Sequence, residues 1–231
     1  MPTMYEIYDK FAAQYHELVV AEDCEGNLPG ALQELTDWNQ INVIEAGAGT
    51  GRITRHYAEQ VNSAVCFDRS SHMLGFAQKL LHQFDSKITY ITADNLCLPQ
   101  LEGDFDLFIE GWSFGHVVCD CKTLAEVKGV TEQLLKNSSV NLGAGGQIIL
   151  IESMGTNVDV PAAPNEQLEL FYHELENVHG FTLKLIRTDY EFESNSEAQR
   201  ILGFFFGEEE VAEIKKRKTG RIPEWTGIWH R

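Results

Sequence analysis

Three alternating glycines follow a short apolar run, and this spacing could shape a ligand site. The run ends around Glu45, and Gly47, Gly49 and Gly51 come next. Glycine reaches positive φ angles and, having no Cβ, lets a flat ligand approach the main chain. A helix that begins near Arg52 would point its free N–H groups at the same spot. The stretch therefore predicts a strand, a tight turn and a helix start that form a shelf for a cofactor.

The spacing of these glycines argues against a pyrophosphate site. A dinucleotide-binding turn follows G-x-G-x-x-G, which from Gly47 would need a glycine where this chain has Arg52. A nicotinamide-dependent oxidoreductase on the same kind of sheet is therefore the weaker alternative. The chain also lacks a Tyr-x-x-x-Lys pair, which argues against that alternative too.

Polar residues close the next two predicted strands. Asp68 ends the run 63–68, and a βαβ unit of ordinary size would bring it beside the glycine turn. There its carboxylate could accept hydrogen bonds from both ribose hydroxyls of an adenosine ligand, although a helix-capping aspartate is the ordinary alternative. Asp94 and Asn95 follow the run 88–92. An acid and an amide at a strand end can bind the exocyclic amine of adenine.

The E-x-G-x-G-x-G motif from Glu45 to Gly51 resembles the first motif of the class I S-adenosylmethionine-dependent methyltransferases. Residues 93–99 are similar to that family's A-D-A-x-x-L-P stretch, and residues 145–152 to its fifth strand. In the family, the turn lies against the methionyl and ribose parts of the cofactor, and the acid matching Glu45 orients the amino group, usually through water. The resemblance covers most of the first 155 residues, and beyond them only the order of strands and helices.

The same resemblance assigns further residues to the cofactor. The residue matching Met73 packs against adenine, Asp94 matches the residue that binds its amine, and Tyr8 and Tyr15 resemble tyrosines of a covering N-terminal segment. Core methionines and core aromatics would look the same in the sequence. The predicted cofactor-binding residues are Glu45, Gly47, Gly49, Gly51, Asp68, Met73, Asp94, Asn95, Gly111, Tyr8 and Tyr15.

His116 is the candidate for acid–base chemistry. It ends the segment 110–116, which follows the predicted fourth strand, residues 105–109. Ligands of open α/β sheets bind over the carboxyl ends of the strands, so this segment should lie between cofactor and acceptor. A histidine can take a proton near neutral pH. A purely structural role is the alternative, and it is the commoner one for a lone histidine.

The cysteines and acids of the sequence do not predict a metal site. The five cysteines are odd in number, which argues against a disulfide framework. Cys119 and Cys121 have no second pair of ligands at zinc-site spacing. Glu110 and Glu152, at the ends of the fourth and fifth predicted strands, are too few for the metal site of a catechol methyltransferase. We therefore predict no metal.

Helical and strand patterns alternate along the chain, which predicts an α/β fold. We expect a Rossmann-like, seven-stranded, mostly parallel sheet with helices on both faces. The resemblance places an antiparallel last strand between the fifth and sixth. The predicted strands are residues 43–46, 63–68, 88–92, 105–109, 147–152, 181–192 and 225–229, and the predicted helices are 4–20, 28–38, 52–60, 70–84, 124–136, 165–177, 194–206 and 208–218.

Length and charge limit the organisation and the partners. We expect a single domain of 231 residues, with a helical cap at 1–38, a cofactor-binding core at 41–155 and a substrate-side part at 156–231. With 18 Lys and Arg against 35 Asp and Glu, the net charge of −17 repels nucleic acid and anionic membranes. No secretory leader or membrane span is visible, so we expect a cytoplasmic monomer or homodimer.

These features predict a methyltransferase that passes a methyl group from S-adenosylmethionine directly to a small-molecule acceptor and leaves S-adenosylhomocysteine. No N-P-P-Y-like run follows the fourth strand, which weakens methylation of nucleobases or glutamine amides. A non-catalytic cofactor-binding module with a protein partner is the other alternative. That module would be favoured if residues 112–116 filled the space beside the methyl group.

Overall fold

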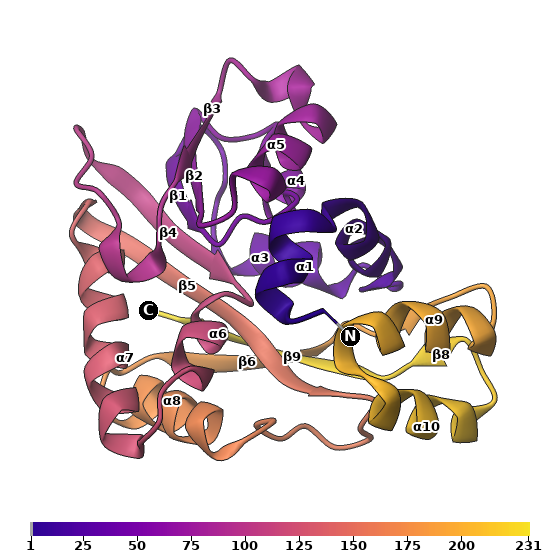
Figure 1. The fold of residues 1–231 in the computed structure, drawn as a ribbon. Coiled ribbons are helices and arrows are strands. Elements are labelled where there is room, and N and C mark those ends of the chain that lie inside the picture. The colour runs from indigo at the N-terminus through magenta and orange to yellow at the C-terminus, as the bar shows by residue number, and fades with distance from the viewer. Residues whose placement is uncertain (1) are drawn as a thin grey trace.

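The computed structural model describes residues 2–231, and it is built on one seven-stranded sheet (Figure 1). The strand order is β3-β2-β1-β4-β5-β9-β6, which confirms the predicted fold. A second, two-stranded sheet pairs β7 with β8. The strands are β1 (Asn42–Ala46), β2 (Ser63–Asp68), β3 (Ile88–Thr92), β4 (Phe105–Gly111), β5 (Leu142–Thr156), β6 (Thr182–Arg187), β7 (Tyr190–Glu191), β8 (Arg221–Ile222) and β9 (Glu224–His230).

The register of the sheet brings the polar strand ends together. Strand β1 runs parallel to both β2 and β4, with Ala46 opposite Phe67 on one side and Glu110 on the other. Asp68 lies opposite Thr92 of β3. Strand β9 is antiparallel to both β5 and β6, as expected. The glycine turn, Asp68 and the end of β4 therefore meet at one edge of the sheet.

Helices cover both faces of the sheet, and each face has its own hydrophobic core. On one face Trp38 stacks on Tyr57, with ring centroids 5.1 Å apart. On the other face Tyr172 stacks on Trp229 at 4.3 Å. The first face carries α3 (Asn27–Leu35), α4 (Thr54–Tyr57) and α5 (Ser71–Leu80), and the second carries α6 (Phe114–Cys119), α7 (Leu124–Ser139) and α8 (Glu166–Asn177).

A third apolar cluster joins the two ends of the chain. Helices α1 (Met4–Lys10) and α2 (Ala12–Ala21) pack against α9 (Asn195–Phe206) and α10 (Glu208–Arg217). Phe11 meets Phe204 edge-on at 5.5 Å, and Tyr15 meets Phe205 at 5.9 Å. Figure 1 draws these four helices at the end of the sheet toward which β5 runs. The cluster thus covers the edge where the polar strand ends meet.

Several predicted elements differ from those observed. The predicted helix 4–20 is broken at Phe11, where φ is −127° and ψ is 40°. The predicted helix 52–60 shrinks to α4, and the predicted strand 181–192 is split into β6 and β7. Strand β5 begins at Leu142, five residues before the predicted strand 147–152, and the short α6 was not predicted. Glycine-rich and short elements carry little periodicity, so pattern reasoning misplaces them.

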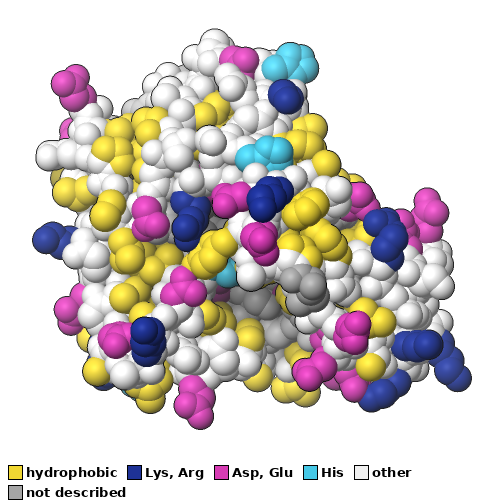
Figure 2. All heavy atoms as spheres, in the orientation of Figure 1, with side chains coloured by type: hydrophobic (Ala, Val, Ile, Leu, Met, Phe, Trp, Pro, Cys, Tyr) yellow, Lys and Arg dark blue, Asp and Glu magenta, His cyan; other side chains and the backbone are white. Residues whose placement is uncertain are grey.

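The surface of the described residues shows mixed charge. On the face drawn in Figure 2, Lys and Arg side chains are scattered among Asp and Glu side chains, and no broad basic patch forms there. Within residues 2–231, no helix has both the length and the apolar character that crossing a membrane requires.

Candidate cofactor and acceptor site

The glycine turn after β1 is held in a left-handed backbone conformation. Gly47, Gly49 and Gly51 have φ angles of 66°, 55° and 84°. A Cβ on Gly47 would lie 2.1 Å from the Cβ of Ser113, so the turn packs directly against the segment after β4. A Cβ on Gly49 would point between Met73 and Tyr15, at 3.8 Å from each side chain. Gly47 is thus needed for packing, and Gly49 leaves space above the turn.

Asp68 links the end of β2 to this turn. Its Oδ2 accepts a hydrogen bond from the Gly49 N–H at 2.9 Å, and its Oδ1 accepts one from the Ser70 N–H at 2.8 Å. Burial raises the pKa of this carboxyl, and the two N–H donors offset part of that effect. The side chain is fixed in place and forms part of the wall of a cavity above the turn.

This first cavity gathers most of the residues predicted for the site. Of the twelve predicted residues, ten line it, and these are Tyr8, Tyr15, Gly47, Gly49, Asp68, Met73, Asp94, Asn95, Gly111 and His116. Five further residues complete the wall, namely Tyr5, Arg69, Trp112, Ser113 and Val117. Trp112 and Ser113 fall in the segment that the sequence predicted to lie here. Arg69 directly follows Asp68, which was the available signal for it.

Glu45 and Gly51 do not line the cavity, contrary to the sequence prediction. The carboxylate of Glu45 faces α4, where it accepts hydrogen bonds from the Thr54 hydroxyl at 2.7 Å and from the Tyr57 hydroxyl. Burial raises the pKa of Glu45 to about 7. Gly51 packs against Leu81, whose Cδ1 would lie 2.8 Å from a Cβ on this glycine. The acid therefore anchors α4, and the third glycine allows close packing.

The N-terminal segment closes over the first cavity. The Ser70 hydroxyl donates to the main-chain oxygen of Tyr8 at 2.9 Å, and the Ala12 N–H donates to His72 at 3.4 Å. The cavity measures about 70 Å³, well below the roughly 300 to 1,000 Å³ of ligand pockets. Tyr8 and Tyr15 both line this small cavity above the turn.

A second and larger cavity adjoins the first. It measures about 610 Å³ and extends from Trp112 and His116 toward β5, β9 and α9. Tyr8, Tyr15, Trp112 and His116 line both cavities. Residues 112–116 therefore form a partition between the two cavities, with Ser113 packed against Gly47.

His116 and Tyr8 form a pair in this partition. The Tyr8 hydroxyl lies 2.7 Å from Nε2 of His116. Burial lowers the pKa of His116 and raises that of Tyr8, so both groups are neutral near pH 7. The phenol then donates to the unprotonated Nε2. The pair can pass a proton between the cavity and the imidazole.

Two buried acids support the partition from below. Glu110 ends β4 and accepts from the Ser113 hydroxyl at 2.8 Å and from the Phe114 N–H at 3.1 Å, so it orients the start of α6. Burial raises its pKa to about 7. Burial and the nearby Glu110 raise the pKa of Glu152, which accepts from the Gly115 N–H. In the described part of the chain, no three His, Cys, Asp or Glu side chains group as metal ligands.

Comparisons with known proteins agree with this architecture. Residues 43–133 match the methyltransferase domain family. The chain is 21% identical over 196 residues to an uncharacterized methyltransferase of Oceanobacillus iheyensis, covering 80% of this chain and 86% of that protein. It is 30% identical over 108 residues to the malonyl-[acyl-carrier protein] O-methyltransferase of Buchnera aphidicola, covering 47% of this chain and 40% of that protein.

A solved structure, the DhpI–SAM–HEP complex, has a similar fold. Its TM-score is 0.55 at 16% identity, and the match covers 98% of this chain and 95% of that chain. The fold, the glycine turn and the matched domain define a Rossmann-like methyltransferase. Residues 43–133 are thus a methyltransferase domain, and the resemblance of the glycine turn to the class I methyltransferases implies S-adenosylmethionine as the cofactor.

The residues around the turn fit this cofactor. The missing Cβ of Gly49 leaves room between Met73 and Tyr15. The fixed carboxylate of Asp68 is a hydrogen-bond acceptor on the same wall. A thioether, a carboxylate and an amide are thus available to an adenosyl group.

Proposed function

We propose that this protein methylates a small-molecule acceptor that binds in the second cavity. The observation that carries the proposal is the shared partition, in which Tyr8, Tyr15, Trp112 and His116 line both the cofactor cavity and the 610 Å³ cavity. An acceptor atom in the larger space can therefore reach a methyl group held at the partition. A non-catalytic module would not need such a chamber.

In the proposed arrangement, the chain's own residues hold and orient the cofactor. Asp68 would accept from the ribose hydroxyls, Met73, Asp94 and Asn95 would face the adenine ring, and Gly47 and Gly49 would lie along the methionyl part. The bound cofactor supplies an already activated methyl group, so the protein needs to align the acceptor and exclude water.

His116 is the proposed proton acceptor when the acceptor atom carries a proton. Its buried, neutral imidazole faces both cavities and is oriented by the Tyr8 hydroxyl. Tyr8 would pass the proton to Nε2 when the acceptor lies closer to the phenol. No covalent bond to the enzyme is required.

Methyl-labelled cofactor tests the function. The purified protein, incubated with labelled S-adenosylmethionine and a small-metabolite extract, should transfer label into the low-molecular-weight fraction and release S-adenosylhomocysteine. Heat-denatured protein is the control. Label recovered in protein or nucleic acid alone, or no transfer by a protein that binds the cofactor, would contradict the proposal.

Replacing the histidine tests its role. His116→Ala should slow turnover by about 100-fold or more, because general-base assistance is lost, while the affinity for the cofactor stays unchanged. His82→Ala, an exposed histidine in η1 (His82–Phe84), is the matched control. A fully active His116→Ala variant would remove the histidine from the mechanism.

A further inference from the structure

The wall of the second cavity carries two acids, Glu152 and Glu224, that form no ion pair with any residue from 2 to 231. Glu152 and Glu224 are 5% and 2% exposed. One carboxylate oxygen of Glu224 accepts from the Ser153 hydroxyl at 2.8 Å, whereas the other, Oε2, is buried and has no hydrogen-bond partner within residues 2–231. A buried acceptor atom left unpaired costs free energy unless a ligand supplies the donor.

The positive charge on the same wall is paired with a different acid. Among the described residues, Arg52 is the only lysine or arginine that lines the cavity. Its guanidinium forms an ion pair with Glu22 and lies 3.2 Å above the centre of the Trp112 ring. His116 is neutral near pH 7 because burial lowers its pKa. The carboxyl groups on this wall therefore have no cation among the described residues to pair with, and a Glu224 that ionises as the pH rises toward 9 would leave its negative charge to a ligand.

The rest of the wall is mostly apolar. Phe205, Leu168 and Leu18 line it, together with the segment that carries Val158 and Ala162. Such a surface binds a hydrocarbon or aromatic body through burial of apolar area. A carboxylate surrounded by apolar side chains attracts a cation strongly, because little water screens the charge.

We propose that the acceptor is a cationic amine with an apolar body, whose ammonium group is bound by Glu224 and Glu152. This inference rests on the proposed function and concerns recognition of the acceptor. The ammonium donates to the unpaired Oε2 of Glu224, and the apolar body lies against Phe205 and Leu168. A phosphorylated or carboxylated acceptor would meet like charge at the same place.

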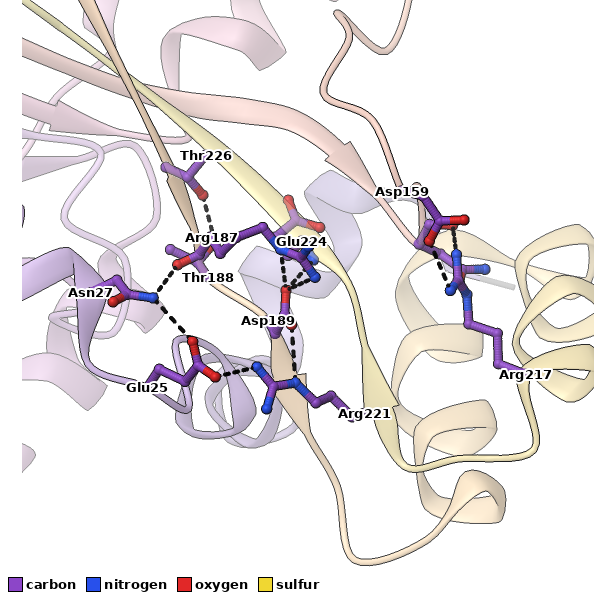
Figure 3. Close-up of polar contacts among 11 residues, drawn as sticks. Glu25, Asn27, Asp159, Arg187, Thr188, Asp189, Arg217, Arg221, Glu224 and Thr226 are labelled. Atoms are coloured by element: carbon purple, nitrogen blue, oxygen red, sulfur yellow. Dashed lines mark hydrogen bonds and ion pairs between the residues drawn. The ribbon is translucent and has the colours of Figure 1, made fainter.

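The start of β9 is fixed, which positions Glu224. Figure 3 shows Asp189 receiving hydrogen bonds from Arg187, Arg221 and the main chain of Glu224. The Glu224 N–H donates to the Asp189 carboxylate at 3.1 Å, and the main-chain oxygen of Glu224 accepts from the Thr188 N–H at 3.0 Å. Burial alone would raise the pKa of Asp189, but these donors lower it. The carboxyl of Glu224 thus extends from a rigid backbone.

The pH dependence of binding follows from the charges around Glu224. Burial and then Glu22 raise its pKa to about 8, against the lowering effects of the Thr156 and Ser153 hydroxyls and of the Arg52 charge. An alkylammonium, with a pKa of about 10 like that of lysine, keeps its proton through this range. Amine affinity should therefore rise as the pH goes from 7 to 9. The titratable and charged groups that face Glu224 are Glu22, Arg52, Tyr172, Asp189 and Tyr190.

Calorimetric titration with matched probes tests the inference. Phenethylamine, 3-phenylpropionate and phenethyl alcohol have similar bodies and differ in charge, and each is titrated into the protein saturated with S-adenosylhomocysteine. We expect the amine to bind at least about 10-fold more tightly than the other two, the difference typical of hydrogen bonds to charged groups. Alkylamines of other lengths, each with its carboxylate and alcohol, extend the panel.

Glu224→Gln should remove the preference for the amine and its rise with pH. Glu166→Gln, an exposed acid on α8, is the matched control and should leave both unchanged. If Glu224→Gln fails to fold, the pH dependence of the wild-type protein still decides the question. Equal or tighter binding of the carboxylates or alcohols, no binding of any amine, or pH-independent amine binding overturns the inference.

The result is separate from the test of the proposed function. Transfer of methyl label to an anionic or neutral acceptor would uphold the function and overturn this inference. Failure of S-adenosylhomocysteine to bind at the start of the titration would overturn the function itself.

Discussion

Asp68 combines two tasks in one side chain. It closes β2, and its two oxygens accept from Gly49 and Ser70, so it shapes the glycine turn and the start of α5 together. A ribose that bound here would add its hydroxyls to a carboxylate already held in place. In the proposed arrangement, Asp68 would contribute to cofactor binding through contact and through preorganisation of the turn.

Removing this carboxylate should weaken cofactor binding. Asp68→Ala is expected to cost about 1.5 to 3 kcal/mol of binding free energy, the range for hydrogen bonds to charged groups. Calorimetric titration with S-adenosylhomocysteine measures it, and Asp85→Ala, an exposed aspartate after η1, is the control. Unchanged affinity would mean that Asp68 acts only as a turn residue.

For single residues, a place at the end of a strand could be predicted from the sequence, whereas the direction of the side chain could not. Asp68 and Asp94 follow strands whose carboxyl ends meet, so spacing was enough to bring them to one cavity. Side chains alternate along a strand, so Glu45 lies on the same face of β1 as Val43. That face packs toward α4. Glu224 joins the site from β9, far along the chain, and only the folded sheet brings it there.

Between elements, the contact of Gly47 with Ser113 joins the turn after β1 to the start of α6. The two glycines of the cavity differ in what surrounds them. An added Cβ at Gly47 would clash with Ser113, whereas one at Gly49 would meet only ordinary contacts. Both glycines have positive φ angles, so both substitutions also carry backbone strain.

Gly47→Ala should therefore destabilise the protein more than Gly49→Ala. We expect Gly49→Ala to lose about 1 to 2 kcal/mol of unfolding free energy from strain, and Gly47→Ala to lose more because of the clash. Urea denaturation measures both. The double variant Gly47→Ala, Ser113→Gly should recover the additional loss, and equal losses in the two single variants would contradict this packing.

The helices with a long amphipathic pattern were predicted correctly. The elements whose bounds depend on tertiary packing were not. Helices α8 and α9 begin and end close to their predicted bounds, since each has an amphipathic pattern and a capping side chain, from Asn165 and Ser194. The break at Phe11 has no proline or glycine to signal it, and its ring packs on Phe204 of a distant helix. Helix α6 is six residues long, too short for a periodic signal.

Across the whole molecule, buried acids and buried histidines respond to pH in opposite senses. Burial raises the pKa values of Glu45, Glu110 and Glu224 to about 7, 7 and 8, so the folded state binds their protons more tightly. Their stabilisation is complete below the ordinary glutamate pKa of 4.5 and is lost as the pH rises through 7 and 8. Burial lowers the pKa of His56 to about 4, and this contribution is complete above 6.5 and is lost toward pH 4.

Stability should consequently decline on the alkaline side of neutrality. Below pH 6.5 the contributions of the buried glutamates and of His56 to stability change in opposite directions with pH. Above pH 6.5 the contribution of His56 is constant, so only the glutamates change the stability. We expect the unfolding free energy to fall by about 2 to 4 kcal/mol between roughly pH 6.5 and 8.5. Urea denaturation across this range measures it. Glu224→Gln should flatten the decline, and a constant or rising stability would contradict the assignment.

The position of β9 inside the sheet has a consequence for biogenesis. Strand β9 lies between β5 and β6 and pairs with both of them in the sheet. A nascent chain that has left the ribosome through β6 can assemble β1 to β5, but β6 has no strand to pair with until β9 emerges. The part of the sheet that carries the glycine turn can thus form during synthesis, while the second cavity, with Glu224 on its wall, is completed only after translation has passed β9.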